Sequence, residues 1–280
     1  MTTLNSYATL QEFKNYWLAR GGENSVDTRD DAVIESLLRT ASRYIDSKTG
    51  RRFTPYIETR YFDVPSEQID LRSLNMDEDL LEAITVVNGD GVTIPSTEYT
   101  LRPRNRTPHL SIRLKDDSTY YWASDGAGDV HDIIAVTGVW GYHDRYSQAW
   151  LLGSTAAEAM DATETGYDVT SGLLLEAGDL IRFDNELGYV SSVATNTLTI
   201  TRGENNSTAA THLTSINITI WQPMEEARNA VCEIANTAYR RRFGQSTTNA
   251  ETVTAAGIVL SPRDIPIMAH EFVSVYRKYM

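Results

Sequence analysis

Hydrophobic residues change their spacing along the chain, and each change predicts a different kind of structure. Over residues 9–20 and 28–49 they recur every three or four positions, which is typical of amphipathic helices. From 52 to about 142 they alternate with polar residues, which predicts antiparallel strands. Short alternating runs continue through 150–222, and helical spacing returns over 223–280. The sequence therefore predicts an α+β protein whose two ends are helical.

Residues at the predicted helix ends support these boundaries. Thr9 and Glu12 form a capping-box pattern, in which two side chains satisfy free backbone N–H groups at a helix start. Thr28 is a candidate cap for the second helix, and Gly50 is the residue expected just past its C-terminus. These two helices and a third over 223–243 are expected to form a bundle packed on the β section.

The strands of the β section are predicted from alternation and from turn signals. An Asn-Gly-Asp-Gly sequence at 88–91 separates two of them, because such dipeptides favour tight turns. We interpret the acidic run at 77–79 as a solvated turn or a helix start rather than a metal site. The expected strands cover 57–63, 83–87, 98–101, 109–114 and 132–139.

Residues 150–222 differ in composition from the rest of the chain. They hold nine acidic and two basic residues and so contribute −7 to the net charge of −13. Their short alternating runs predict a small β-barrel or sandwich inserted in a larger domain. The expected domains are thus 150–222 on one side, and 1–149 together with 223–280 on the other. The expected strands of the inserted domain are 180–183, 188–193, 197–201 and 216–221.

The C-terminal part predicts two helices joined by a linker. Pro223 fits the first turn of a helix that ends near 243. Residues 245–256 are polar and rich in Thr, which is typical of a mobile linker, so 245–280 would form a C-terminal arm. The final helix, up to residue 279, is densely apolar. It must bury that face either on its own domain or in a groove on a partner, and the sequence favours neither.

Composition limits the classes of function. A net charge of −13 argues against a protein whose main task is to grip nucleic acid, although DNA could pass an acidic wall without sticking to it. No apolar run approaches the ~20 residues that cross a bilayer, and the N-terminus lacks the pattern of a secretion signal. Cys232 is the single cysteine, so an intramolecular disulfide and a cysteine cluster for zinc are excluded. Its apolar surroundings predict a core residue.

The sequence carries no recognisable catalytic set. It contains no phosphate-binding glycine loop and no Gly-x-Ser-x-Gly elbow. The pairs at 131–132 and 143–144, each His followed by Asp, would point to opposite faces of a strand, and His212 is isolated. We therefore expect no catalytic residue, no cofactor and no metal. A hydrolase that acts on host envelope or DNA through His131 or His143 is a third hypothesis.

Two basic clusters have more than one interpretation. For the cluster at 240–242, the simplest interpretation is that positive charges are favourable at the negative C-terminal end of the predicted helix. A second interpretation is an ion pair with acidic groups on a neighbouring subunit, and DNA contact ranks third. The residues expected at a subunit interface are Arg240, Arg241, Arg242, Arg51 and Arg52.

Several segments together resemble one family of proteins. They are residues 7–14, 30–38, 44–46, 49–53, 136–142, 227–243 and 276–279. In this order they resemble the head-to-tail connector (adaptor, or head-completion) proteins of tailed bacteriophages, over about residues 7–145 and 223–280. Residues 150–222 depart from the compact form of that family. The segments 179–183, 197–203 and 209–212 resemble a small β module of phage structural proteins, in which Arg202-Gly203 would make a tight turn.

The resemblance implies a structural virion protein and not an enzyme. Connectors of this family form a ring beneath the portal, usually of twelve subunits, and double-stranded DNA passes through its lumen without sequence-specific binding. The ring would join the portal to a stopper or tail-completion protein at the neck of the virion, after assembly in the host cytoplasm and without a membrane.

The resemblance also implies that the C-terminal arm binds the portal. Aromatic side chains would be its anchors, as is common at protein interfaces. The expected docking residues are Ile265, Met268, Phe272, Val275, Tyr276 and Tyr279.

An alternative function is a virion accessory or tail protein whose β insert recognises a carbohydrate or another virion protein. In that case the exposed aromatic residues would be Tyr167, Tyr189 and Trp221.

Overall fold

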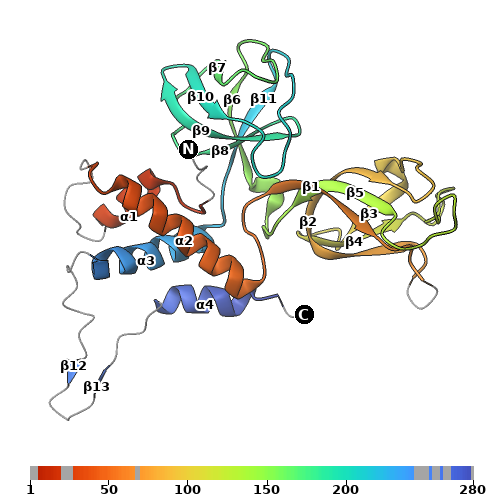
Figure 1. Cartoon of the computed structure of the whole chain (residues 1–280), viewed down its shortest axis with the longest axis horizontal. Coiled ribbons are helices and arrows are strands. Elements are labelled where there is room, and N and C mark those ends of the chain that lie inside the picture. Colours follow the sequence, from red (N-terminus) through yellow and green to blue (C-terminus); the bar gives the residue numbers. More distant parts are fainter. Residues whose placement is uncertain are drawn as a thin grey trace. The chain divides into compact units, whose positions relative to one another are not determined.

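A computed structural model describes residues 6–19, 28–66, 70–242, 252–253, 259–260 and 266–278. Within these residues it holds four helices and two antiparallel sheets, with a further two-stranded pair, so the mixed α+β prediction is confirmed. The chain divides into two compact units, which Figure 1 shows with their elements labelled. The helical unit contains residues 1–53 and 223–280, and the β unit contains residues 54–222.

The helical unit joins the two ends of the chain. Its helices are α1 (Leu10–Ala19), α2 (Asp31–Thr49), α3 (Glu225–Arg242) and α4 (Ile267–Tyr276), and a short pair of strands, β12 (Thr252–Val253) and β13 (Val259–Leu260), precedes α4. Both α2 and α3 contact α4, and both contact α1. The four helices therefore share one core.

The helix ends confirm most of the predicted caps. The Thr9 backbone N–H donates to Glu12 Oε2 at 2.7 Å and the Glu12 N–H donates to Thr9 Oγ1 at 3.1 Å, which is the reciprocal capping box. Gly50 adopts φ 67° and its N–H bonds to Asp46 O, so it ends α2 as predicted. The predicted cap at Thr28 is wrong: α2 begins at Asp31, with Asp30 in the cap position and no side-chain cap bond.

Aromatic rings form the centre of the helical unit. Phe53 is fully buried, and its ring lies 5.7 Å from that of Tyr7 and 5.1 Å from that of Phe272. The Tyr7 hydroxyl accepts a bond from Phe53 N and donates to the Asp46 carboxylate. Burial raises the pKa of Tyr7 well above its ordinary value, helped by the charge of Asp46, so the hydroxyl keeps its proton and remains a donor.

The final helix folds back onto its own unit. Besides Phe272, the ring of Tyr276 packs edge-on against Phe53 at 6.0 Å. The Arg51 Nε–H donates to the carbonyl of Tyr276 at 2.9 Å, and the Lys278 N–H donates to the carbonyl of Thr49 at 2.7 Å. Of the two placements that the sequence leaves open for this helix, the structure shows the intramolecular one.

The first sheet of the β unit has the strand order β1-β5-β2-β4-β3. Every neighbouring pair is antiparallel, and the core on one face includes Leu80, Ile112, Val136 and Trp140. Two short 3₁₀ helices, η1 (Ser96–Glu98) and η2 (Tyr146–Gln148), accompany it. Its strands are β1 (Tyr56–Phe62), β2 (Ser73–Val87), β3 (Tyr99–Arg102), β4 (His109–Leu114) and β5 (Ile134–Trp140).

The acidic run at 77–79 lies inside β2, so the prediction of a turn or helix start there is wrong. The register between β2 and β4 shifts between Asn75 and Leu80, which marks an irregular stretch of strand. Such irregularities re-aim side chains and tolerate residues that regular strands disfavour. The carbonyl of Asp79 still accepts the N–H of Gly141 at 2.9 Å.

The second sheet closes into a small barrel. Its order is β6-β11-β8-β9-β10-β7, and the two ends meet where Ala156 pairs with Val169. The core holds Tyr167, Phe183, Leu198 and other apolar side chains that alternate with exposed ones along the strands. Its strands are β6 (Trp150–Thr155), β7 (Gly166–Asp168), β8 (Leu180–Phe183), β9 (Glu186–Ala194), β10 (Thr197–Thr201) and β11 (Asn217–Trp221).

The two sheets of the β unit share a second apolar core. The first sheet contributes Ile57, Leu81 and Val139 to it, and the barrel contributes Leu180, Leu187, Tyr189 and Trp221. This burial explains why residues 54–149 group with the barrel in one compact unit, whereas the sequence analysis assigned them to a domain with the helices.

An ion pair reinforces that contact. Arg182 of β8 binds Glu82 of β2 through both terminal nitrogens, at 2.7 and 3.1 Å, and Tyr146 Oη donates to the same carboxylate at 2.8 Å. Burial is the largest influence and would raise the pKa of Glu82, but the hydrogen bonds and charge of Arg182, together with the bond from Tyr146, lower it. Glu82 is therefore ionised, and the two sheets are joined by charge as well as by apolar contact.

The packing of α4 can be tested with truncations at a buried and at an exposed position of the same helix. Phe272→Ala removes a buried ring, and we expect it to lower the free energy of unfolding of the helical unit by about 3–5 kcal/mol. Val275→Ala shortens a side chain that is 72% exposed and should change the free energy of unfolding by less than about 0.5 kcal/mol. Urea unfolding together with hydrogen exchange of the α4 amides measures both. Equal effects of the two variants would show that α4 does not pack through Phe272.

Candidate functional site

The most elaborate polar site in the described residues lies at one end of the barrel, around His212. Its ring is buried between two carboxylates: Nδ1 lies 3.0 Å from Asp184 Oδ2 and Nε2 lies 2.9 Å from Glu186 Oε2. Each ring nitrogen of His212 therefore faces a carboxylate oxygen at hydrogen-bond distance, and the tautomer decides which nitrogen donates.

Glu186 is the acceptor on which this end of the barrel converges. Its side chain is 1% exposed, and Arg202, 5% exposed, binds it through Nε at 2.9 Å and Nη2 at 2.7 Å. The backbone N–H groups of Gly203 and Ala210 donate to it as well. Burial alone would raise the pKa of Glu186, but the bonds from Arg202 and His212 hold the pKa below its ordinary value.

Arg202 links this pair to the connection between β6 and β7. Its Nη1 donates to the carbonyl oxygens of Asp161 and Glu164, and its Nη2 donates to that of Ala210. The guanidinium therefore fixes the backbone of a turn whose side chains are acidic. The group Asp184, Glu186, Arg202 and His212, which we call the charge cluster, brings two carboxylates together with one guanidinium and one imidazole ring.

The charge cluster rests on the barrel core. The ring of His212 meets that of Phe183 edge-on at 4.8 Å, and the Arg202 guanidinium lies 5.7 Å from the same ring. Asp184, at φ 53°, and Asn185 form the tight turn between β8 and β9. The turn expected at Arg202-Gly203 is present in part, since Gly203 has φ 64°.

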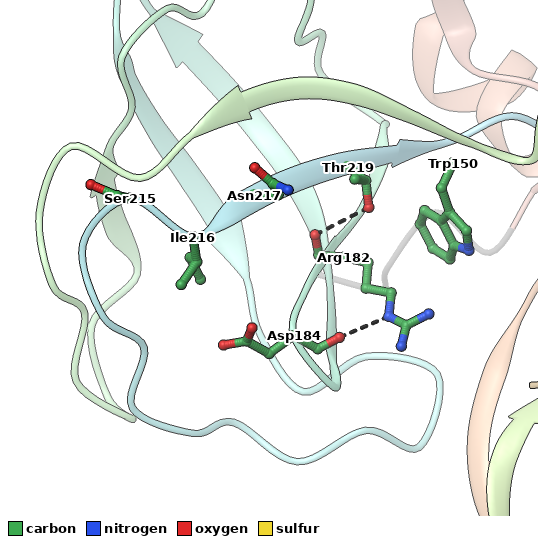
Figure 2. Close-up of a pocket in the computed structure, with 7 residues that line it drawn as sticks. All are labelled: Trp150, Arg182, Asp184, Ser215, Ile216, Asn217 and Thr219. Carbon is green, nitrogen blue, oxygen red and sulfur yellow. Dashed lines mark hydrogen bonds between the residues drawn. The ribbon is translucent and has the colours of Figure 1, made fainter. Parts of the chain in front are cut away.

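Two hollows border the charge cluster. The one in Figure 2 has a volume of about 480 Å³. Within it the Arg182 Nε–H donates to the carbonyl of Asp184 at 2.7 Å, and the Thr219 hydroxyl donates to that of Arg182 at 3.4 Å. These two bonds tie Arg182, Asp184 and Thr219 together along one wall of the hollow. The lining residues are Trp150, Arg182, Asp184, Ser215, Ile216, Asn217 and Thr219.

The second hollow, of about 410 Å³, lies between β1 and the loop that carries His212. Glu58 and Thr59 line it from β1, and Asp184, Glu186 and His212 line it from the barrel. The ring nitrogens of His212 are both engaged by carboxylates, and Glu186 is engaged by Arg202. This arrangement favours a role in holding the loops of the barrel together over a role in proton transfer, because both ring nitrogens of the histidine are already in contact with carboxylates and neither is left for a substrate.

Some of the residues predicted to dock on the portal are buried in the structure and others are exposed. Phe272 is buried and Tyr276 packs on Phe53, so in this placement of α4 neither is available as an anchor. Met268 and Val275 are exposed, at 55% and 72%, and Ile267 beside them is exposed at 59%. Ile265 and Tyr279 lie outside the described residues.

The predicted interface arginines have partners within their own unit. The guanidinium of Arg240 lies 5.2 Å from the ring centre of Trp17, and Arg51 binds the C-terminal carbonyl of α4. Arg52 and Arg241 also take part in interactions inside the molecule. Arg242 is the last residue of α3, as predicted for the end of that helix. Their expected contact with a neighbouring subunit stays a prediction.

The aromatic residues expected on the barrel surface are not there. Tyr167 is fully buried, and Tyr189 and Trp221 are 4% and 5% exposed. All three lie in apolar cores of the β unit, so none can serve as a stacking platform for a sugar. The prediction that these three rings are exposed is wrong.

The histidine pairs do not form a common site. His131 is on the surface, with Nδ1 at 3.2 Å from Asp63, whereas His143 is buried against Trp221 with a ring distance of 5.3 Å. The buried thiol of Cys232 has a pKa raised to about 12, chiefly by burial, and is therefore protonated. Among the described residues, no group of three or more His, Cys, Asp or Glu could hold a metal ion.

Comparisons with known proteins add no family assignment. No family model matches the chain, and no curated protein matches it. In the part of the chain that the structure describes, no helix is long and apolar enough to cross a membrane.

Removal of one charge from the charge cluster should destabilise the barrel strongly. Glu186→Gln leaves Arg202 buried without its counter-charge, so we expect a loss of about 3–5 kcal/mol in the free energy of unfolding at pH 7. Asp184→Asn is the control, because Asp184 is 58% exposed and its loss should cost less than about 1 kcal/mol. Urea unfolding measures both. Similar losses in the two variants would contradict the central role of Glu186.

The same site predicts a pH dependence. Because the pKa of Glu186 is lowered in the folded state, its ionised form contributes stability above its ordinary pKa of 4.5. That contribution is lost as the pH falls through the lower pKa of the folded state. In Glu186→Gln this component should be missing, so the stability of the variant should fall less steeply below about pH 4.5. Urea unfolding midpoints of both proteins, measured from neutral to acidic pH, test this. If the two midpoint curves ran parallel, the assignment to Glu186 would be wrong.

Proposed function

We propose that this chain is a structural virion protein, a head-to-tail connector of a tailed phage. In this proposal it forms a ring beneath the portal, joins it to a stopper or tail-completion protein, and lets DNA pass through its lumen. It is not an enzyme, uses no cofactor and has no membrane role. The proposal starts from the sequence resemblance in residues 7–145 and 223–280.

One observation carries the proposal beyond that resemblance. Helix α4 is fixed through the buried ring of Phe272, and it leaves the side chains of Ile267, Met268 and Val275 exposed. Exposed apolar side chains that cluster on one element are typical of protein-binding surfaces. A final helix that is anchored in its own unit and still exposes apolar side chains could bind the portal ring through those side chains.

The proposal also includes the finer architecture. The helices would form a bundle on the first sheet, and the barrel would be an accessory domain carried by that connector core. A ring of about twelve copies is what the resemblance implies. Assembly in the host cytoplasm and a final place in the neck of the virion belong to the same proposal.

The docking face can be tested without removing α4. Truncation of the arm would uncover Phe53 and so confuse unfolding with loss of docking. Met268→Asp with Val275→Asp instead places two charges on the exposed face. We expect a folded protein whose affinity for portal rings falls at least about a hundredfold, since hot-spot contacts contribute about 2 kcal/mol or more each. Co-sedimentation with portal rings measures it.

A charge-matched control separates docking from electrostatics. His270→Asp with Ser274→Asp adds two acidic groups at exposed polar positions of the same helix and leaves Ile267, Met268 and Val275 unchanged. This variant should bind portal rings within about threefold of the original chain, which is well under 1 kcal/mol. If the variant at 268 and 275 bound as well as the control, the docking role of α4 would be wrong.

A further inference from the structure

Three arginine side chains at the end of β3 and in the loop to β4 have no partner among the described residues. Arg102, Arg104 and Arg106 are all exposed, and none of their guanidinium groups makes a hydrogen bond, ion pair or ring contact with a described residue. Most other arginines in the described chain bind a carboxylate, a carbonyl or an aromatic ring, as Arg60, Arg113 and Arg182 do. We call residues 102–108 the arginine loop. Within the described part of one copy, these three positive charges have no counter-charge in contact.

The arginine loop is held in a defined shape. The Thr107 hydroxyl donates to the carbonyl of His143 at 2.7 Å and accepts the N–H of Tyr146 at 3.2 Å. At its other end His109 Nδ1 lies 2.9 Å from the carbonyl of Pro103. Burial lowers the pKa of His109, which keeps the ring neutral and able to donate from that nitrogen. A loop fixed in this way loses little conformational entropy when it binds a partner.

A complementary surface lies on the barrel of the same chain. The connection from β6 to β7 and β7 itself carry Glu158, Asp161, Glu164 and Asp168, and no basic side chain pairs with any of these carboxylates. Arg202 binds the backbone carbonyls of Asp161 and Glu164, so it fixes this turn without neutralising its side chains at close range. We call residues 158–168 the acidic turn.

We propose that the arginine loop of one copy binds the acidic turn of the barrel of a second copy. Among the described residues of one copy the two surfaces make no ion pair with each other, and neither has an ion-pair partner elsewhere. A contact between two different patches is heterologous, so it repeats from copy to copy and closes into a ring when the rotation permits. This inference needs self-association only and is independent of any role in a virion.

Charge decides between this partner and DNA. Duplex binding uses a broad positive surface with many phosphate contacts. The arginine loop offers three arginines in a chain of net charge −13, and residues 150–222 carry −7 of it. Such a chain repels a polyanion except at the loop itself, whereas it supplies acidic surface for the loop on every further copy.

The test exchanges charge between the two surfaces in the full-length chain. One variant is Arg104→Glu with Arg106→Glu, and the other is Glu158→Arg with Glu164→Arg. The second leaves the bonds of Arg202 to backbone carbonyls in place. Each variant alone presents like charges at the contact, so we expect its dissociation constant for self-association to rise at least about tenfold. An equimolar mixture restores opposite charges, and we expect association within about threefold of the original chain.

Sedimentation velocity over a range of concentrations, at about 50 and about 500 mM salt, measures these constants, and the original chain should associate more weakly at high salt. Asp117→Arg with Glu176→Arg is the control, since both residues are exposed acidic groups outside the acidic turn and the change in net charge is the same. The control should associate at least as well as the original chain.

Several results would overturn the inference. These are a chain that stays monomeric at both salt concentrations, a glutamate variant that associates like the original, and a mixture that fails to recover. Fluorescence anisotropy with a duplex DNA probe covers the competing partner. If the original chain bound the duplex, and Arg104→Glu with Arg106→Glu abolished that binding without changing self-association, the loop would be a DNA contact instead.

Discussion

Arg202 and Glu186 lose nearly all contact with water in the folded barrel, and a charge pair so placed is tolerated only when the groups around it are bonded. The barrel meets that requirement by bringing three segments to one point: the start of β9, the end of β10 and the loop that carries His212. The same guanidinium holds the carbonyls of the β6–β7 connection. One ion pair therefore fixes the loops at this end of the barrel relative to one another.

A second ion pair of the β unit has a different task. Arg182 and Glu82 join strands from two sheets that are separate in sequence, and the two sheets also share the apolar core that includes Trp221. Burial is the largest influence on the pKa of each carboxylate and raises it, but the arginine and the other hydrogen-bond donors together lower the pKa below its ordinary value. The pair at Glu186 shapes loops, whereas the pair at Glu82 sets how firmly the barrel is attached to the first sheet.

Much of this fold can be predicted from local pattern. The capping box at Thr9 and Glu12, the glycine end of α2 at Gly50 and strand β4 depend on neighbours in sequence, and the structure confirms them. Strand β6 escaped prediction because Leu151 and Leu152 are adjacent and both exposed, so apolar and polar residues do not alternate there. The long strand β2 was predicted only in its second half, because its acidic residues imitate a loop.

The charge cluster could not be predicted for a physical reason. Asp184, Glu186, Arg202 and His212 come from turns spread over nearly thirty positions, and only the closure of the barrel brings them together. His212 looked isolated because its partners precede it on another hairpin. The placement of α4 was likewise undetermined, because Phe272 could meet either Phe53 or a partner.

The closure of the barrel affects how several copies of the protein can lie close together. Open sheet edges present unpaired backbone groups, and at high local concentration they pair with the edges of other molecules. The bridge between Ala156 and Val169, with the bonds from Thr170 to Thr155 and from Ala157 to Asp168, joins the ends of β6 and β7 and uses those groups internally. Many barrels can then stand next to one another without strand exchange, so that contacts between copies are selected by side-chain charge and shape rather than by backbone pairing.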